Sequence, residues 1–110
     1  MINTYVLVGR LTRDFEIEEK DGKKTATNTL AVPRPYKNAN GEYDTDFFPI
    51  STYDNLATTC AEHCKKGDMI GIKGNLTAKD NKIFLKIDRM TFISSKSKKD
   101  ELEQEKKLDM

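Results

Sequence analysis

Two-residue turn signals between β-rich runs constrain this chain more than any other feature, because each one holds two strands in a hairpin. Asp21-Gly22 and Asp80-Asn81 are the two such turns. Alternating apolar and polar residues, together with β-branched and aromatic residues, mark the runs on either side. The strands that we predict are Tyr5–Leu11 continued by Phe15–Glu19, Thr25–Val32, Thr45–Tyr53, Met69–Lys79 and Lys82–Ile93.

A single helix interrupts these strands. Asp54-Asn55 can cap it, and Gly67 is the expected stop after a last helical residue near Lys66. The apolar residues at helical spacing are Leu56, Ala57, Cys60, Ala61 and Cys64. Three strands, a helix and two further strands follow the order of an OB-fold. We therefore predict an all-β domain, a five-stranded Greek-key barrel with one helix between strands 3 and 4.

The chain has 110 residues, which is enough for one domain of ordinary size. We place that domain at residues 1–93. Pro33 is expected to end its strand, and the polar residues 34–44 are expected to form a long exposed loop. Residues 94–110 carry five lysines and five acidic residues with few apolar side chains, so we expect a flexible charged tail.

Catalysis and metal binding find little support in the sequence. The one histidine, His63, falls in the predicted helix with no nucleophile pattern around it, and no glycine-rich loop leads into a helix. Cys60 and Cys64 are four residues apart in that helix, which fits buried apolar side chains better than a disulfide or a zinc site. We expect no enzymatic activity, no cofactor and no metal.

Charge and hydropathy narrow the possible partners only in part. The N-terminus has no basic segment before a long apolar run, and no apolar stretch approaches the roughly 18 residues of a membrane span. We therefore expect a cytoplasmic protein with no membrane partner. The formal net charge of +1 neither favours nor excludes nucleic acid, so any basic surface must come from the arrangement of charges.

Aromatic residues among basic ones give the positive signal for function. Tyr36 lies between Arg34 and Lys37, and period-two counting places Phe47 and Tyr53 on one strand face. Exposed rings of this kind bind unpaired bases, with about 1–3 kcal/mol of stacking per base. The alternatives are that Phe47 and Tyr53 belong to the barrel core and that Tyr36 folds onto the barrel.

Cations near these rings would neutralise phosphates, and binding would then weaken steeply as salt is raised. The candidates are Arg10, Arg13, Arg34, Lys37, Lys73, Lys79 and Lys86.

Several ordered stretches of residues 1–93 resemble those of bacterial and phage single-stranded DNA-binding proteins. They are Met1-Ile2-Asn3, residues 6–14 (VLVGRLTRD), Leu30-Ala31-Val32, Gly41-Glu42, Thr45-Asp46-Phe47-Phe48, Leu56-Ala57, Lys65-Lys66-Gly67-Asp68, Gly74-Asn75-Leu76 and Phe92-Ile93. Several motifs in the same order, at nearly the spacing found in the family, are together far more specific than any single motif.

The resemblance implies a homo-oligomer, usually a tetramer, that binds single-stranded DNA without strong sequence preference. Its members protect exposed strands in replication, recombination or repair, in the cytoplasm and at the nucleoid. The stacking aromatics of the family correspond here to Tyr36, Phe47 and Tyr53. The resemblance moves these three from core to binding residues and leaves Phe48 and Ile50 in the core.

Two departures from the family pattern change what is expected. The hairpin at Asp80-Asn81 is too short for the family's additional stacking aromatic, so we expect a smaller DNA footprint, with Phe84 as a weak substitute. The tail ends Lys107-Leu108-Asp109-Met110 in place of an acidic tip with Pro-Phe, which puts recruitment of replication and repair proteins in doubt.

Two alternative functions stay open. One is an OB-fold adaptor, resembling primosome proteins, that docks other proteins. The other is an RNA-binding OB module.

Overall fold

The computed structural model describes residues 1–95. Both predicted two-residue turns are present in it, and their residues have left-handed backbone angles. The φ angles are 54° at Asp21, 78° at Gly22, 52° at Asp80 and 63° at Asn81. Two successive positive φ angles give a turn whose twist matches that of the flanking strands. The elements are β1 (Tyr5–Leu11), β2 (Glu16–Lys20), β3 (Lys23–Lys37), β4 (Tyr43–Tyr53), α1 (Asp54–His63), β5 (Met69–Lys79) and β6 (Lys82–Ser94).

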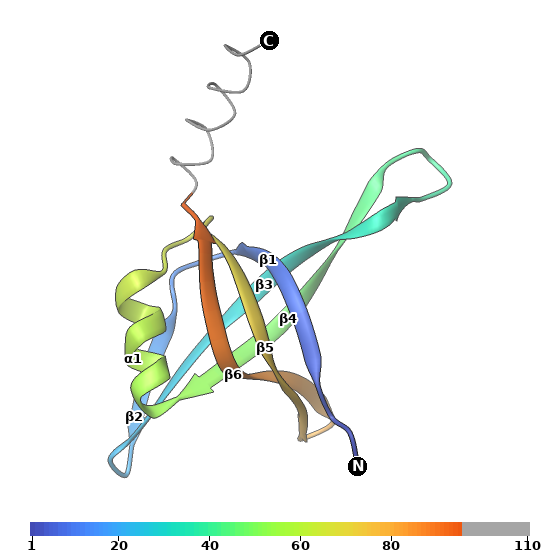
Figure 1. The fold of residues 1–110 in the computed structure, drawn as a ribbon. Coiled ribbons are helices and arrows are strands. Elements are labelled where there is room, and N and C mark those ends of the chain that lie inside the picture. The colour runs from blue at the N-terminus through green and yellow to red at the C-terminus, as the bar shows by residue number, and fades with distance from the viewer. Residues whose placement is uncertain (96–110) are drawn as a thin grey trace.

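Five of the six strands close into a barrel (Figure 1). The sheet order is β1-β5-β6-β4-β3-β2, and a further pairing of β1 with β3 completes the closure. Among residues 1–95, β2 pairs only with β3 and continues the sheet outside the barrel. Since α1 lies between the third and fourth barrel strands in sequence, the prediction of a five-stranded barrel with one helix is confirmed.

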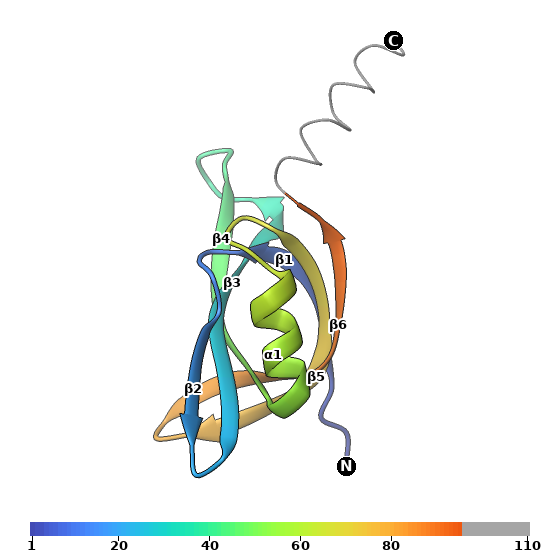
Figure 2. The same ribbon diagram turned by 90° about the vertical axis from the view of Figure 1, so that its left-hand side faces the viewer.

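Inward-facing side chains of the strands and one face of α1 form the core. Figure 2 shows α1 running along one side of the barrel, where it packs against β2, β3 and β4. The buried hydrophobic residues are Leu11, Phe15, Ala26, Leu30, Ile50, Ala57, Cys60, Cys64, Ile70, Ile72, Leu85 and Ile87. Both cysteines are buried free thiols, as the helical spacing predicts, and burial raises the pKa of Cys60 to about 12.

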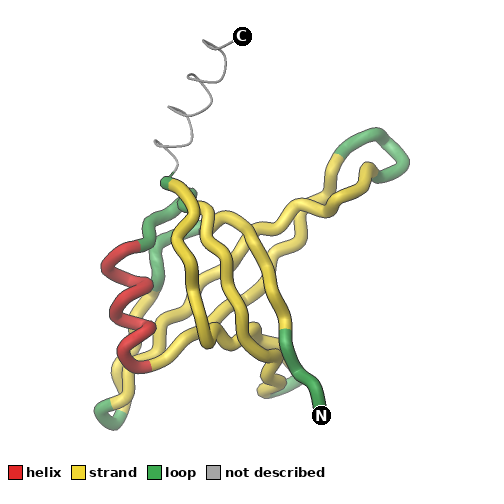
Figure 3. The backbone as a smooth tube through the Cα atoms, in the orientation of Figure 1, coloured by secondary structure: helices red, strands yellow, loops and turns green. Residues whose placement is uncertain are grey.

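The predicted loop at residues 34–44 is wrong. β3 continues through Pro33 and Pro35 to Lys37, and β4 already begins at Tyr43, so these residues form a two-stranded hairpin that projects from the barrel (Figures 1 and 3). We call residues 34–44 the arm. A proline fits an extended strand wherever the ladder does not need its missing N–H, and the β3–β4 register shifts between Pro33 and Lys37.

The helix also ends earlier than predicted, at His63 rather than near Lys66. Two hydrogen bonds to side chains, one local and one tertiary, hold the next residues in a turn. The N–H of Lys65 donates to Asp68 Oδ2 at 2.8 Å, and the N–H of Lys66 donates to Asp14 Oδ1 at 2.8 Å. A nearby carboxylate, Asp68, and a distant one, Asp14, thus compete successfully with helix propensity at this end.

The predicted tail at residues 94–110 lies outside the described residues except for Ser94, which ends β6, and Ser95. No helix among residues 1–95 is long and apolar enough to cross a membrane.

A glycine permits the closure of the barrel. A Cβ atom at Gly9 would lie 2.6 Å from the carbonyl oxygen of Ala31 and 2.9 Å from side-chain atoms of Leu30 and Val32. At position 9, β1 and β3 can therefore approach this closely only because the residue has no side chain. Gly71, on β5, differs, because a Cβ there would make ordinary contacts at 3.6 Å or more.

We expect Gly9→Ala to lower the free energy of unfolding by about 1–3 kcal/mol through overpacking at this crossing. Urea unfolding at a fixed protein concentration measures the change. Gly71→Ala is the matched control and should differ from the wild type by much less. Equal stability of the two variants would contradict the close approach of β1 and β3.

Candidate nucleic-acid interface

Two aromatic rings stand outward on β4. Phe47 and Tyr53 are 63% and 43% exposed, whereas Phe48 on the opposite strand face is half-buried and Ile50 is buried. The alternation of β4 therefore separates core residues from surface rings, as period-two counting predicts.

The cross-strand neighbours of these two rings on β3 have small side chains. In the β3–β4 register, Ala31 lies opposite Phe47, and Thr25 lies opposite Tyr53. On the β3 side of β4, such small neighbours do not cover either ring. A flat, accessible ring is what an unstacked base needs as a partner.

The arm carries two further exposed tyrosines, Tyr36 and Tyr43. Lys37 pairs with Tyr43 across the hairpin, and its Nζ lies 5.8 Å from the centre of the Tyr43 ring. The sequence analysis missed Tyr43 because it placed this residue in a loop. Its spacing from Phe47, four residues along one strand, is the signal that could have identified it.

Arg34 holds the two strands of the arm together. Its Nε and Nη2 atoms donate to the carboxylate of Asp46 at 3.0–3.3 Å, and its Nη1 lies 3.8 Å from Asp44 Oδ2. The hydrogen bonds from Arg34 lower the pKa of Asp46, and Asp46 in turn raises the pKa of Arg34. Within the arm the Arg34 charge is thus already paired with a carboxylate.

The other candidate cations lie in different surroundings. Lys86 lies beside an exposed ring, with its Nζ 5.6 Å from the centre of Tyr53. Arg10 donates to the carbonyl of Gly67 at 2.9 Å, and Arg13 forms an ion pair of 3.2 Å with Glu16. Arg10 also lines a groove of about 450 Å³ with residues of β3 and β4, among them Ala31, Pro33 and Thr45.

Two candidates lie on β5, which β6 separates from β4 in the sheet. Lys79 is next to the turn of the β5–β6 hairpin. Lys73 pairs with Val6 and Arg89, and β5, which carries it, is separated from β4 by β6. The structure therefore brings Lys37 and Lys86 to aromatic rings and leaves Lys73 on another face.

The described part of the chain contains no recognisable metal-binding site. No three His, Cys, Asp or Glu side chains converge there as metal ligands, and His63 is exposed.

Comparisons with known proteins give one consistent result. A model of the single-strand binding protein family matches residues 2–83. A single-stranded DNA-binding protein of Streptococcus mutans is 43% identical over 81 residues, which are 73% of this chain and 49% of that protein. One from Staphylococcus epidermidis is 31% identical over 109 residues, which are 92% of this chain and 83% of that protein.

A solved structure shares the fold. The wild-type single-stranded DNA binding protein from Thermus aquaticus aligns with a TM-score of 0.70 at 23% identity, over 84% of this chain and 41% of that one. The chain spans about half the length of the Streptococcus mutans protein.

The pairing of Arg34 with Asp46 predicts a measurable titration. Arg34→Gln removes the charged donor, so the pKa of Asp46 should rise towards its ordinary value of 3.8. Because the pKa is lowered in the folded protein, the pair stabilises above the unfolded-state pKa of Asp46. That contribution is lost as the pH falls through the folded-state pKa.

Carbon-detected NMR of the side-chain carboxyls follows this titration. Lys37→Gln is the control, since it removes one positive charge from the arm without touching Asp46. An Asp46 pKa that stays equally low in Arg34→Gln would contradict the assignment.

Proposed function

The chain belongs to the single-strand binding protein family, and we propose that its barrel binds single-stranded DNA without strong sequence preference. The observation that carries this proposal is the pair of exposed rings, Phe47 and Tyr53, on the outer face of β4 with Lys86 beside Tyr53. The family resemblance predicted from the sequence is confirmed. Family membership makes the chain a binding protein rather than an enzyme.

Stacking and charge neutralisation would act together. Phe47 and Tyr53 are six residues apart on β4, which is roughly 20 Å at the rise of a strand, so they would take bases that are not adjacent. Tyr36 would extend this track along the arm. Arg10, Arg13, Arg34, Lys37, Lys79 and Lys86 remain candidates for phosphate contacts, with Lys73 the least favoured by its position.

The short β5–β6 hairpin supports a small footprint on each subunit. Its turn consists of Asp80 and Asn81, and Phe84 is half-buried on β6. This hairpin therefore offers little ring surface to the DNA.

We propose that the chain self-associates into a tetramer. The contact would cover an apolar face of the barrel formed by β1, β5 and β6. Val6, Val8 and Ile93 are exposed, and Val8 and Ile93 flank Gly71. β1 pairs with β3 only at its last two residues, so within the described part of the chain the same edge of β1 is open from Tyr5 to Gly9. An apolar face next to an open strand edge is suited to a second copy of the chain.

Such an oligomer would coat DNA strands exposed in the cytoplasm during replication, recombination or repair. Coating would keep them from nucleases and from re-annealing.

We expect Tyr36→Ala, Phe47→Ala and Tyr53→Ala each to weaken binding to oligo-dT by about 1–3 kcal/mol, or roughly 5- to 150-fold in Kd. Fluorescence anisotropy at two salt concentrations measures this. Phe92→Leu is the control. Phe92 is 43% exposed, as Tyr53 is, but it lies near the C-terminal end of β6.

Matched oligo-U and duplex DNA complete this experiment. Tight binding to oligo-dT that the three alanine variants lose supports the proposal. Preference for oligo-U would favour an RNA-binding module, and indifference to all three ligands would favour a protein adaptor. Either result would overturn single-stranded DNA binding as the function.

The oligomer has its own test. Val8→Asp places a charge on the apolar face of β1, so light scattering should show the wild type at four times the monomer mass and Val8→Asp at a smaller multiple. Ile17→Asp on β2, a similarly exposed position, should leave the mass unchanged. A monomeric wild type, or an unchanged mass in Val8→Asp, would count against this interface.

A further inference from the structure

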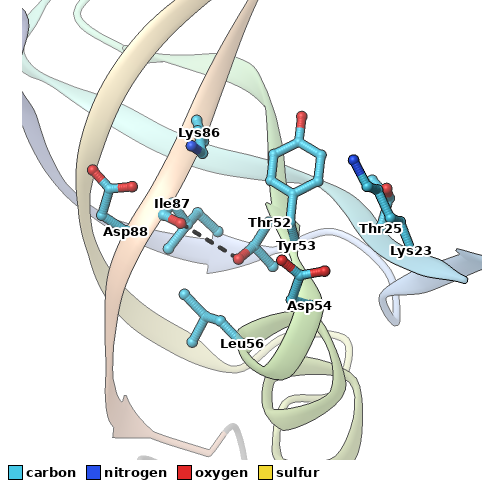
Figure 4. A pocket seen from close by; sticks show the side chains of 9 residues that line it. All are labelled: Lys23, Thr25, Thr52, Tyr53, Asp54, Leu56, Lys86, Ile87 and Asp88. Carbon is cyan, nitrogen blue, oxygen red and sulfur yellow. Dashed lines mark hydrogen bonds between the residues drawn. The ribbon is translucent and has the colours of Figure 1, made fainter.

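A hollow of about 560 Å³ lies beside the Tyr53 ring (Figure 4). Three parts of the fold form it, namely the start of β3, the junction of β4 with α1, and the middle of β6. The lining residues are Lys23, Thr25, Thr52, Tyr53, Asp54, Leu56, Lys86, Ile87 and Asp88. Its volume falls within the range of roughly 300–1,000 Å³ typical of small-molecule pockets.

The hollow offers both an apolar surface and cations. Leu56 and Ile87 contribute apolar atoms next to the aromatic ring. Lys23 and Lys86 come from opposite sides of Tyr53, on β3 and β6 (Figure 4), and neither forms an ion pair within residues 1–95. A planar group on the ring, flanked by negative charges, would satisfy these features, and a nucleotide has that composition.

Two carboxylates distinguish this hollow from a plain stacking platform. Asp54 is the first residue of α1, after the N-cap Tyr53, and its side chain forms no ion pair with another residue of 1–95. Asp88, on β6, accepts a hydrogen bond of 3.3 Å from the amide nitrogen of Asn75 through one oxygen, which leaves the other oxygen free of any hydrogen bond in the described chain. Both side chains line the hollow from different elements (Figure 4).

We propose that this hollow binds one base of the single strand and selects for an exocyclic amino group, so that cytosine is preferred to thymine. An ionised carboxylate only accepts hydrogen bonds, and the amino group of cytosine is a donor suited to Asp or Glu. Thymine presents a carbonyl oxygen at that position, which a carboxylate repels. This subsite rests on the proposed binding of single-stranded DNA and adds a modest base preference to it.

The double variant Asp54→Asn and Asp88→Asn tests the selection. Asparagine keeps the size of the side chain, donates to carbonyl oxygens, and tolerates the φ of 58° at position 54. We expect the ratio of the Kd for oligo-dC to that for oligo-dT to rise by about 3- to 10-fold. The asparagine amide can donate to the carbonyl oxygen of thymine, whereas the amino group of cytosine loses its charged acceptor.

A control separates selection from net charge. Glu18→Gln with Glu19→Gln removes two negative charges from β2, whose residues are exposed and lie outside the hollow. This variant should strengthen binding of both oligonucleotides by the same factor and leave the ratio of the two Kd values unchanged.

The outcomes distinguish this inference from the function on which it rests. If neither oligonucleotide binds the wild type, the proposed function itself fails. If both bind and the asparagine variant keeps the wild-type ratio, or changes it no more than the glutamine control, the base selection is overturned while DNA binding stands.

Discussion

Pairing between β1 and β3 is the constraint on which the outer surface depends. It spans only Arg10 with Ala31 and Leu11 with Leu30, yet it turns an open sheet into a barrel. Once the barrel is closed, the strands that form it have one face towards the core and one towards the surface. The rings of β4 then stand at the surface because their neighbours in the chain fill the interior. Gly9 permits this because any side chain there would collide with β3.

Much of the barrel follows from local sequence patterns. The two-residue turns predict both tight hairpins, and alternation over Thr45–Tyr53 separates inward Ile50 from outward Phe47. These features depend on residues close together in the chain, for which turn chemistry and period-two burial are reliable guides. The DNA-binding roles of the rings come instead from the family resemblance and stay predictions.

The arm and the end of α1 could not be predicted in the same way. Prolines in the segment suggest a loop, but Arg34 and Asp46, 12 residues apart, hold it as a hairpin. Asp14 similarly reaches across the fold to the residues after α1. The net charge is also an incomplete guide to the site, because it does not show which charges are paired. A net charge of +1 does not reveal that Arg34 is paired with carboxylates while Lys86 faces an aromatic ring. Contacts between distant segments decide these details, and no local pattern encodes them.

NMR titration of the wild-type protein with oligo-dT tests the central claim most directly, because it observes the rings themselves. We expect the ring protons of Tyr36, Phe47 and Tyr53 to move upfield as bases stack on them, while the methyl signals of Val6 and Val8 keep their positions. Shifts confined to Val6, Val8 and their neighbours on the β1–β5–β6 face, with the three rings unaffected, would contradict the account.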